Sequence, residues 1–399
     1  MAESTIKIPV GPQHPFLKEP CKFEFEISGE EIRGAKIRMG YNHRGMEKAC
    51  EDRNYYQCLY LLERICGICS HSHTTAYIQA VESLLGLELP KRGLYLRTLV
   101  CELERLHSHL LWLGVAAHEV GFDTLFMYTW RDRELVMNIL EEISGNRVNY
   151  AINTVGGVRR DITAEQRKKI LDLTKVVRER VAYYANIGTN EPSFMARIQG
   201  VGKMSTERAI EKCAVGPFAR ASNVDRDVRR DDPYAAYGDL EFKVITSDSC
   251  DILGRVVVRV LEMVESCKMI DQLLDKLPEG EIAVQKVPRR VPAGAAVSRY
   301  EAPRGEDVHY VRSNGTDKPE RVKVRAPTLC NLEAAAESVV GSYVADIPIA
   351  IASIDPCFSC TDRTTVLLND RRRGVRMATW EELRRHGVDW YRQNKGIRF

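Results

Sequence analysis

The sequence predicts a mainly α-helical protein in which long helices form a bundle, with a small β region at the N-terminus and short strands towards the C-terminal half. The main observation is that apolar residues recur at helical spacing over five long segments. These segments are Thr75–Leu85, Leu94–His118, Asp123–Ser144, Ala164–Ile187 and Leu253–Leu277. The second observation is a run of alternating apolar and polar residues near the N-terminus.

That N-terminal alternation predicts a β-hairpin. Lys22–Ser28 and Glu31–Met39 each place apolar residues at every second position, and Ser28-Gly29-Glu30 lies between them. A glycine-containing turn between two alternating segments is typical of a hairpin.

The second half of the chain is less regular. Gly216–Lys243 is rich in Arg, Asp, Gly and Pro and has weak periodicity, which predicts an ordered loop. Val284–Val324 contains several Pro and Gly residues and predicts loops and short strands. We expect a further helix at Leu332–Val344 and a short strand at Ile349–Ile354.

Three regions follow from these patterns. Residues 1–45 are the expected β region, and residues 46–363 are a helical body with a cysteine pair near each end. Residues 364–399 form a basic extension with nine Lys or Arg and four Asp or Glu residues.

The composition is that of an ordinary soluble globular protein. Of 399 residues, 44% are hydrophobic and 28% charged, and the formal net charge of +3 does not argue for nucleic-acid binding. No stretch reaches the ~18 uncharged apolar residues of a membrane span. Met1–Pro9 lacks the long apolar run of a signal peptide. Membrane association is therefore expected to come through partner subunits.

Four of the twelve cysteines form two Cys-x-x-Cys pairs, Cys66 with Cys69 and Cys357 with Cys360. Two intervening residues let both thiolates face one ion, and thiolates prefer soft or borderline metals. The other eight are predicted to be small core residues. They are Cys21, Cys50, Cys58, Cys101, Cys213, Cys250, Cys267 and Cys330.

Three simpler explanations compete with a shared catalytic metal site. A structural zinc site is one, but zinc pairs commonly lie roughly 12–20 residues apart, and Cys69 and Cys357 are 288 positions apart. A thioredoxin-like redox motif needs a βαβ context, whereas Cys66 lies between a polar stretch and a helix. The third explanation is that both Cys-x-x-Cys pairs arose by chance. Spacing alone favours a shared metal site and does not identify the metal.

The residues within and around the cysteine motifs resemble those of a known family. The segments 63–71 (ERICGICSH) and 355–360 (DPCFSC) together resemble the paired signatures of nickel–iron hydrogenase large subunits. Five further motifs resemble the membrane-bound, ferredoxin-linked, energy-converting branch, which is related to the 49 kDa subunit of respiratory complex I. They are GPQHP at 11–15, ELERLHSH at 102–109, GGVRRD at 156–161, YEAPRG at 300–305 and CTDR at 360–363.

The resemblance implies the ligands of a Ni–Fe centre. Cys66, Cys69, Cys357 and Cys360 would bind nickel, and the second cysteine of each pair, Cys69 and Cys360, would bridge to an iron that carries carbon monoxide and cyanide. Cys357 would accept a proton when hydrogen is split, because metal-bound thiolates are deprotonated.

The same resemblance implies nearby catalytic residues. Arg304 matches an arginine over the open face of nickel, where its planar guanidinium could stabilise developing charge. Asp355 matches a carboxylate near the active site. Glu19 matches the carboxylate that exchanges protons with the terminal cysteine.

Glu47 matches a carboxylate at a separate magnesium-type metal site. That metal usually also takes a histidine where this chain has Arg363. Residues beyond Arg363 resemble an extension that a maturation protease removes once nickel is inserted, although some relatives retain it. The histidines at positions 71, 73, 107 and 109 are expected to pack or to form hydrogen bonds.

The function implied is reversible reduction of protons to H₂, with electrons from ferredoxin. The resemblance implies a small subunit with a [4Fe–4S] cluster, a ferredoxin-like electron-transfer subunit and an ion-pumping membrane arm with antiporter-like subunits. It places the chain peripherally on the cytoplasmic side of the membrane. The alternatives are a quinone- or polysulfide-reducing relative and a structural zinc scaffold. The quinone branch lacks the four cysteines and has histidine where this chain has Lys18, so retention of all four favours the hydrogenase.

Overall fold

The computed structural model describes residues 5–361, 368–370, 374–376 and 380–396. The chain forms two compact units, Met1–Asp362 and Arg363–Phe399. In the second unit the described elements are the antiparallel strands β9 (Leu368–Asp370) and β10 (Gly374–Arg376) and helix α14 (Trp380–Lys395). The expectations for Arg363 and for cleavage directly after it lie outside the described residues.

The N-terminal sheet of the first unit has three antiparallel strands in the order β1-β2-β3. They are β1 (Ile6–Val10), β2 (Lys22–Ser28) and β3 (Glu31–Arg38). The β2–β3 pair is the predicted hairpin, and every second residue of β2 is buried, as the alternation requires. The prediction missed β1, which adds to the free edge of β2.

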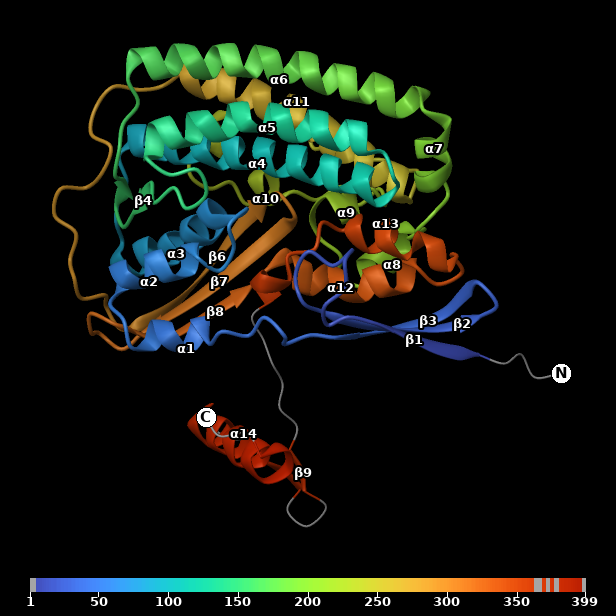
Figure 1. The fold of residues 1–399 in the computed structure, drawn as a ribbon. Helices are drawn as coiled ribbons and strands as arrows, with labels where there is room; N and C mark the ends of the chain where they lie inside the picture. Colours follow the sequence, from blue (N-terminus) through green and yellow to red (C-terminus); the bar gives the residue numbers. More distant parts are fainter. Residues whose placement is uncertain (1–4, 362–367, 371–373, 377–379, 397–399) are drawn as a thin grey trace. The chain divides into compact units, whose positions relative to one another are not determined.

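Four long antiparallel helices form the bundle, and they lie side by side in Figure 1. They are α4 (Lys91–Glu119), α5 (Asp123–Ser144), α6 (Ala164–Asn190) and α11 (Ile252–Asp275). Helix α4 is the central one, because most of its residues are buried and it contacts both α5 and α11. The prediction of a mainly α-helical fold with a long-helix bundle is therefore confirmed.

Three helices precede the bundle. They are α1 (Met46–Glu51), α2 (Tyr55–Glu63) and α3 (Ser70–Leu85). The sequence reading placed a helix only over part of α3. The two-residue strands β4 (Asn153–Thr154) and β5 (Gly157–Val158) connect α5 to α6. No helix within the described ranges is long and apolar enough to span a membrane.

The region between α6 and α11 is more regular than predicted. It contains α7 (Pro192–Ile198), α8 (Thr206–Glu211), α9 (Gly216–Arg220), α10 (Val228–Asp231) and η1 (Tyr237–Asp239). Gly216–Lys243, expected to be a loop, thus carries three short helical turns. Tertiary packing stabilises turns that have too few residues to show a helical period.

A second antiparallel sheet lies beneath α3 and has the order β6-β7-β8. Its strands are β6 (Gly294–Ala302), β7 (Gly305–Ser313) and β8 (Pro319–Arg325). This is the region where short strands were predicted, and β6 and β7 are each nine residues long.

The chain then forms α12 (Pro327–Ser338), η2 (Val344–Asp346), α13 (Ile347–Ala352) and η3 (Phe358–Thr361). The predicted strand at Ile349–Ile354 is wrong, because most of it is helix α13. Its continuous apolar run is buried against α4 and α12, and a short buried run fits a helix as well as a strand.

The single cysteines are mostly core residues, as predicted. Cys21, Cys50, Cys58, Cys101 and Cys267 are buried. Cys250 and Cys330 are half-buried, and Cys213 is exposed, so the prediction fails for Cys213.

Candidate metal centre

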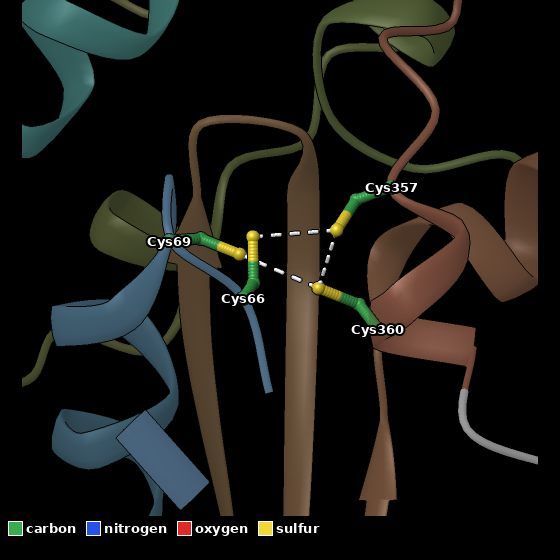
Figure 2. Close-up of side chains that lie close together, drawn as sticks. All are labelled: Cys66, Cys69, Cys357 and Cys360. Atoms are coloured by element: carbon green, nitrogen blue, oxygen red, sulfur yellow. Dashed lines mark hydrogen bonds between the residues drawn. The ribbon is translucent and has the colours of Figure 1, made fainter. Parts of the chain in front are cut away.

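The two cysteine pairs meet at one buried point. Cys66 and Cys69 lie in the loop between α2 and α3, and Cys357 and Cys360 lie between α13 and the end of η3 (Figure 2). The Sγ atoms are 3.3 Å apart for Cys66 and Cys357, 3.5 Å for Cys69 and Cys360, and 2.8 Å for Cys357 and Cys360. Each of the first two contacts joins residues 291 positions apart. We refer to these residues as the four-cysteine site.

The first loop is held by two buried carboxyl groups. Glu63 ends α2 and accepts a hydrogen bond from the backbone N–H of Ala151 at 2.6 Å. Glu104 of α4 accepts hydrogen bonds from the backbone N–H groups of His71 at 2.7 Å and Ser72 at 3.0 Å. These donors belong to the first turn of α3, which has no side-chain cap of its own. Glu104 therefore fixes the helix start that directly follows Cys69.

The second loop is held by two residues distant in sequence. The backbone N–H of Cys357 donates to Thr328 Oγ1 at 3.1 Å. The backbone N–H of Ser359 donates to Glu19 Oε2 at 2.8 Å, and the Ser359 hydroxyl contacts the other oxygen of Glu19. The predicted proton carrier thus lies against the cysteine loop, and its carboxylate contacts Ser359.

Arg304 lies in the tight turn between β6 and β7 and points towards the second cysteine loop. Its Nε donates to the backbone oxygen of Asp355 at 2.8 Å, its Nη2 to Asp355 Oδ1 at 2.7 Å, and its Nη1 to Ser108 Oγ at 3.3 Å. Burial opposes the charge on Arg304, yet Asp355 and the nearby cysteines raise its pKa well above the ordinary value. Burial also raises the pKa of Asp355, against the effect of Arg304.

The backbone of that turn is fixed by a close approach to α9. A Cβ atom on Gly216 would lie 2.3 Å from Gly305 Cα and 2.5 Å from the Arg304 oxygen. Both glycines also have positive φ, +67° and +126°. Only glycine fits at this crossing. Arg105 of α4 further binds the backbone oxygen of Glu301, just before the turn, at 2.5 Å.

A cavity of about 250 Å³ opens beside the site. Cys66, Cys357, Arg304, Asp355 and Glu19 all contribute to its wall. The rest of the lining is mainly apolar. The predicted catalytic residues therefore share one cavity with the first cysteine of each pair.

The electrostatics of the site call for a cation. Cys357 donates to Cys66 and thereby lowers the pKa of Cys66 well below its ordinary value. Burial and the neighbouring thiols raise the pKa of Cys360 well above it. Four thiolates at these separations would repel one another strongly in a buried site. A soft or borderline metal ion would remove that repulsion, so the donor set fits such an ion.

The sequence did not predict a role at the site for several residues that lie next to it. His73 Nε2 lies 3.3 Å from Cys360 Sγ. Its position, one helical turn after Cys69, was the available signal. Glu104 and Ser108 lie in the ELERLHSH motif, which by itself predicted no role for either residue. The hydroxyl of Tyr150 and Nε2 of His107 form a hydrogen bond of 2.6 Å, and no sequence pattern predicted a role for Tyr150.

Glu47 lies apart from these residues. Its carboxylate accepts from the backbone N–H of Val324 at 2.9 Å and contacts Lys323 Nζ at 3.1 Å. Among the described residues Glu47 does not join two other candidate ligands in a possible metal group. The magnesium-type site at Glu47 stays a prediction.

A long-helix bundle that brings two Cys-x-x-Cys pairs together beside a buried arginine is the arrangement expected of a hydrogenase large subunit, and the large subunits of complex I are related to this class. A model described as "Nickel-dependent hydrogenase" matches residues 44–115, and one described as "Respiratory-chain NADH dehydrogenase, 49 Kd subunit" matches residues 119–289 and 287–363. The chain belongs to this family, as a large subunit of the membrane-bound, energy-converting hydrogenase type that is related to the 49 kDa subunit.

Individual relatives cover nearly the whole chain. The membrane-bound hydrogenase subunit alpha of Pyrococcus furiosus is 44% identical over 93% of this chain and 90% of its own length. Formate hydrogenlyase subunit 5 of Escherichia coli is 38% identical over 96% of this chain and 67% of its own length. Among solved structures, a chain of the membrane-bound sulfane sulfur reductase, an archaeal respiratory membrane complex, superposes with a TM-score of 0.86. It is 32% identical and covers 91% of this chain and 100% of that one.

Proposed function

We propose that the chain is the catalytic subunit of a membrane-bound nickel–iron hydrogenase that reversibly reduces protons to H₂. The observation that carries the proposal is the convergence of four buried cysteine sulfurs from two loops 291 positions apart, directly beside the Arg304–Asp355 pair. A structural zinc site that stabilises one local segment would not need loops so far apart in the sequence, and it would not need an arginine beside the cysteines. The resemblance in the cysteine motifs and the nickel-dependent family match support nickel as the metal.

The four cysteines would hold the Ni–Fe centre. When bound, that centre supplies the site at which hydrogen is formed or split, with the iron carrying carbon monoxide and cyanide. Cys69 and Cys360 are the proposed bridging pair, and their sulfurs face each other at 3.5 Å. Cys66 and Cys357 would be terminal ligands, which agrees with their exposure to the cavity.

The surrounding residues orient charge and move protons. Asp355 accepts two hydrogen bonds from Arg304 and so holds the guanidinium at the cavity wall. A fixed cation at this place needs no reorganisation when negative charge develops nearby. Cys357 is the proposed proton acceptor. Glu19 lines the same cavity as Cys357, and its hydrogen bond to Ser359 keeps it beside the second cysteine loop. From there it would pass protons between Cys357 and solvent.

Electrons and ion movement require partners. We propose a small subunit with a [4Fe–4S] cluster, a ferredoxin-like electron donor and an ion-pumping membrane arm with antiporter-like subunits, on the cytoplasmic side of the membrane. Relatives named as membrane-bound hydrogenase and formate hydrogenlyase subunits support this assembly. Ferredoxin-driven H₂ evolution is the proposed physiological direction.

A second candidate function is sulfur reduction in a related respiratory complex. The superposition with a chain of the sulfane sulfur reductase favours it. A structural zinc scaffold is a third and needs neither Arg304 nor the cavity.

Infrared absorption of the purified complex, together with its nickel content, tests the proposal. Carbonyl and cyanide bands with about one nickel per chain are expected, and Cys357→Ser should abolish hydrogen activity while the assembled subunit stays soluble. Cys330→Ser, at a half-buried cysteine outside the site, is the matched control. Zinc without nickel, or full H₂ evolution by Cys357→Ser, would exclude the proposed centre.

A further inference from the structure

A second group of metal-binding side chains lies beside the four-cysteine site. His73 comes from α3, and Asp307 and His309 come from the same face of β7, which packs against α3. His73 Nδ1 lies 3.0 Å from Asp307 Oδ2 and 3.2 Å from His309 Nε2, and His309 Nε2 lies 3.3 Å from Asp307 Oδ2. All three side chains are buried. Two imidazole nitrogens and one carboxylate oxygen therefore form a nearly equilateral triangle.

Three polar atoms meet at the centre of this triangle, and only one of the three pairs has hydrogen-bond geometry. The contact between His73 Nδ1 and His309 Nε2 has hydrogen-bond geometry, so one of these nitrogens must act as the acceptor. Within the described part of the chain, neither oxygen of Asp307 has a hydrogen-bond partner. The contacts of Asp307 Oδ2 to His73 and His309 are ion-pair contacts, and Asp307 Oδ1 has no partner there, so the carboxylate is incompletely satisfied. A cation between the three atoms would satisfy all of them at once.

We propose that His73, Asp307 and His309 bind a divalent cation of the zinc or iron(II) class. Metal–nitrogen and metal–oxygen bonds of about 2.0–2.2 Å, at angles between octahedral and tetrahedral, place ligand atoms roughly 3.0–3.5 Å apart. The three measured separations fall in this range. Two imidazoles and one carboxylate form a ligand set that such ions use in proteins, with further positions left for water.

The charge on Asp307 agrees with this role. Burial acts to raise the pKa of Asp307, yet His73 and His309 lower it below the ordinary value, so the side chain is an anionic ligand. The site is distinct from the one expected at Glu47, which shares none of these residues.

The proposed ion would also fix the contact between His73 and the four-cysteine site. A metal on Nδ1 leaves the ring proton on Nε2, and Nε2 faces Cys360 Sγ at 3.3 Å. Metal-bound histidines almost always donate their other N–H to an acceptor, and here the sulfur of Cys360 is in place. The second ion would thus orient a hydrogen bond to Cys360. Its binding does not depend on nickel, because none of its three ligands is a cysteine.

Metal analysis of the purified complex tests the site. The wild-type protein should contain about one equivalent of zinc or iron that is missing from both His309→Gln and Asp307→Asn. His109→Gln, at a buried histidine of α4 outside the triangle, should keep that equivalent. Unchanged metal content in His309→Gln and Asp307→Asn would overturn the proposal.

The Cys357→Ser variant separates the two metal sites. It should lose nickel and retain the additional metal, and X-ray absorption at the edge of that metal should show a nitrogen and oxygen shell. Scattering from sulfur ligands alone, or no metal in addition to those of the Ni–Fe centre and its iron–sulfur partner, would reject the second site. This measurement needs no substitution in the triangle, so it decides the question even where His309→Gln fails to fold.

Discussion

Arg304 and Asp355 are 51 positions apart in the sequence, yet Arg304 donates to both the backbone oxygen and the carboxylate of Asp355, at 2.8 and 2.7 Å. Asp355 also has a positive φ of 57°. The planar fork of arginine suits two acceptors on one residue. Because Asp355 lies two residues before Cys357, this pair fixes the positive charge of Arg304 next to the second cysteine loop.

Arg304→Lys should therefore lower hydrogen turnover by about 10–100-fold while nickel stays bound, because lysine keeps the charge and loses the fork. Initial H₂ evolution rates and nickel content of the purified complex measure this. Arg299→Lys, at a more exposed arginine of β6, is the matched control. Equal turnover of Arg304→Lys and wild type would remove Arg304 from the mechanism.

Glu19→Gln should reduce H₂ evolution by roughly 10–100-fold, since glutamine cannot carry the proton. One side-chain oxygen remains to accept the Ser359 N–H, so the loop geometry and the infrared bands should be unchanged. Glu24→Gln, at a partly exposed glutamate of β2, should behave like the wild type. A Glu19→Gln variant with full activity would assign proton transfer to another residue.

Gly216→Ala should destabilise the protein by about 2–4 kcal/mol, because the new Cβ would overlap the backbone of Gly305. Gly86→Ala has a similar φ, +62° against +67°, and nothing within 4 Å of the added atom. This control should cost only about 1–2 kcal/mol. Chemical denaturation of the two variants compares them, and equal losses would show that the crossing is not tight.

Glu104→Gln should change how stability depends on pH. Burial raises the pKa of Glu104 to about 8 in the folded protein, against an ordinary value of 4.5. Between these values the unfolded chain loses the proton first, so the folded state binds more protons and the free energy of unfolding decreases as pH rises. The variant should lack this decrease.

Urea unfolding of the full chain prepared without nickel, at pH 5 and pH 8, measures the effect of Glu104. Glu165→Gln, at an exposed glutamate of α6, should keep the wild-type pH dependence. If the free energy of unfolding depends on pH identically in wild type and Glu104→Gln, the carboxyl group is ionised at both pH values. The three hydrogen-bond donors around Glu104 would then lower its pKa by more than burial raises it.

The sequence alone determined the long helices and which four cysteines are the candidate metal ligands. Helical periodicity is a local property, so the segment at Asp123–Ser144 could be bounded correctly from its own residues and from Gly145. The cysteine motifs, with Arg304 and Asp355, were likewise recognisable as short strings of residues. These short strings suggested the Ni–Fe ligands before any distance was known.

Only the tertiary structure decided which of these residues meet. The short run before Cys357 forms helix α13 because it packs against α4, and Gly216 lies against the turn at Arg304 because α9 crosses that turn. Asp307 and His309 had no signal at all until β7 placed them against His73. Such contacts join segments far apart in the chain, and the packing of whole elements creates them, so no local pattern can encode them.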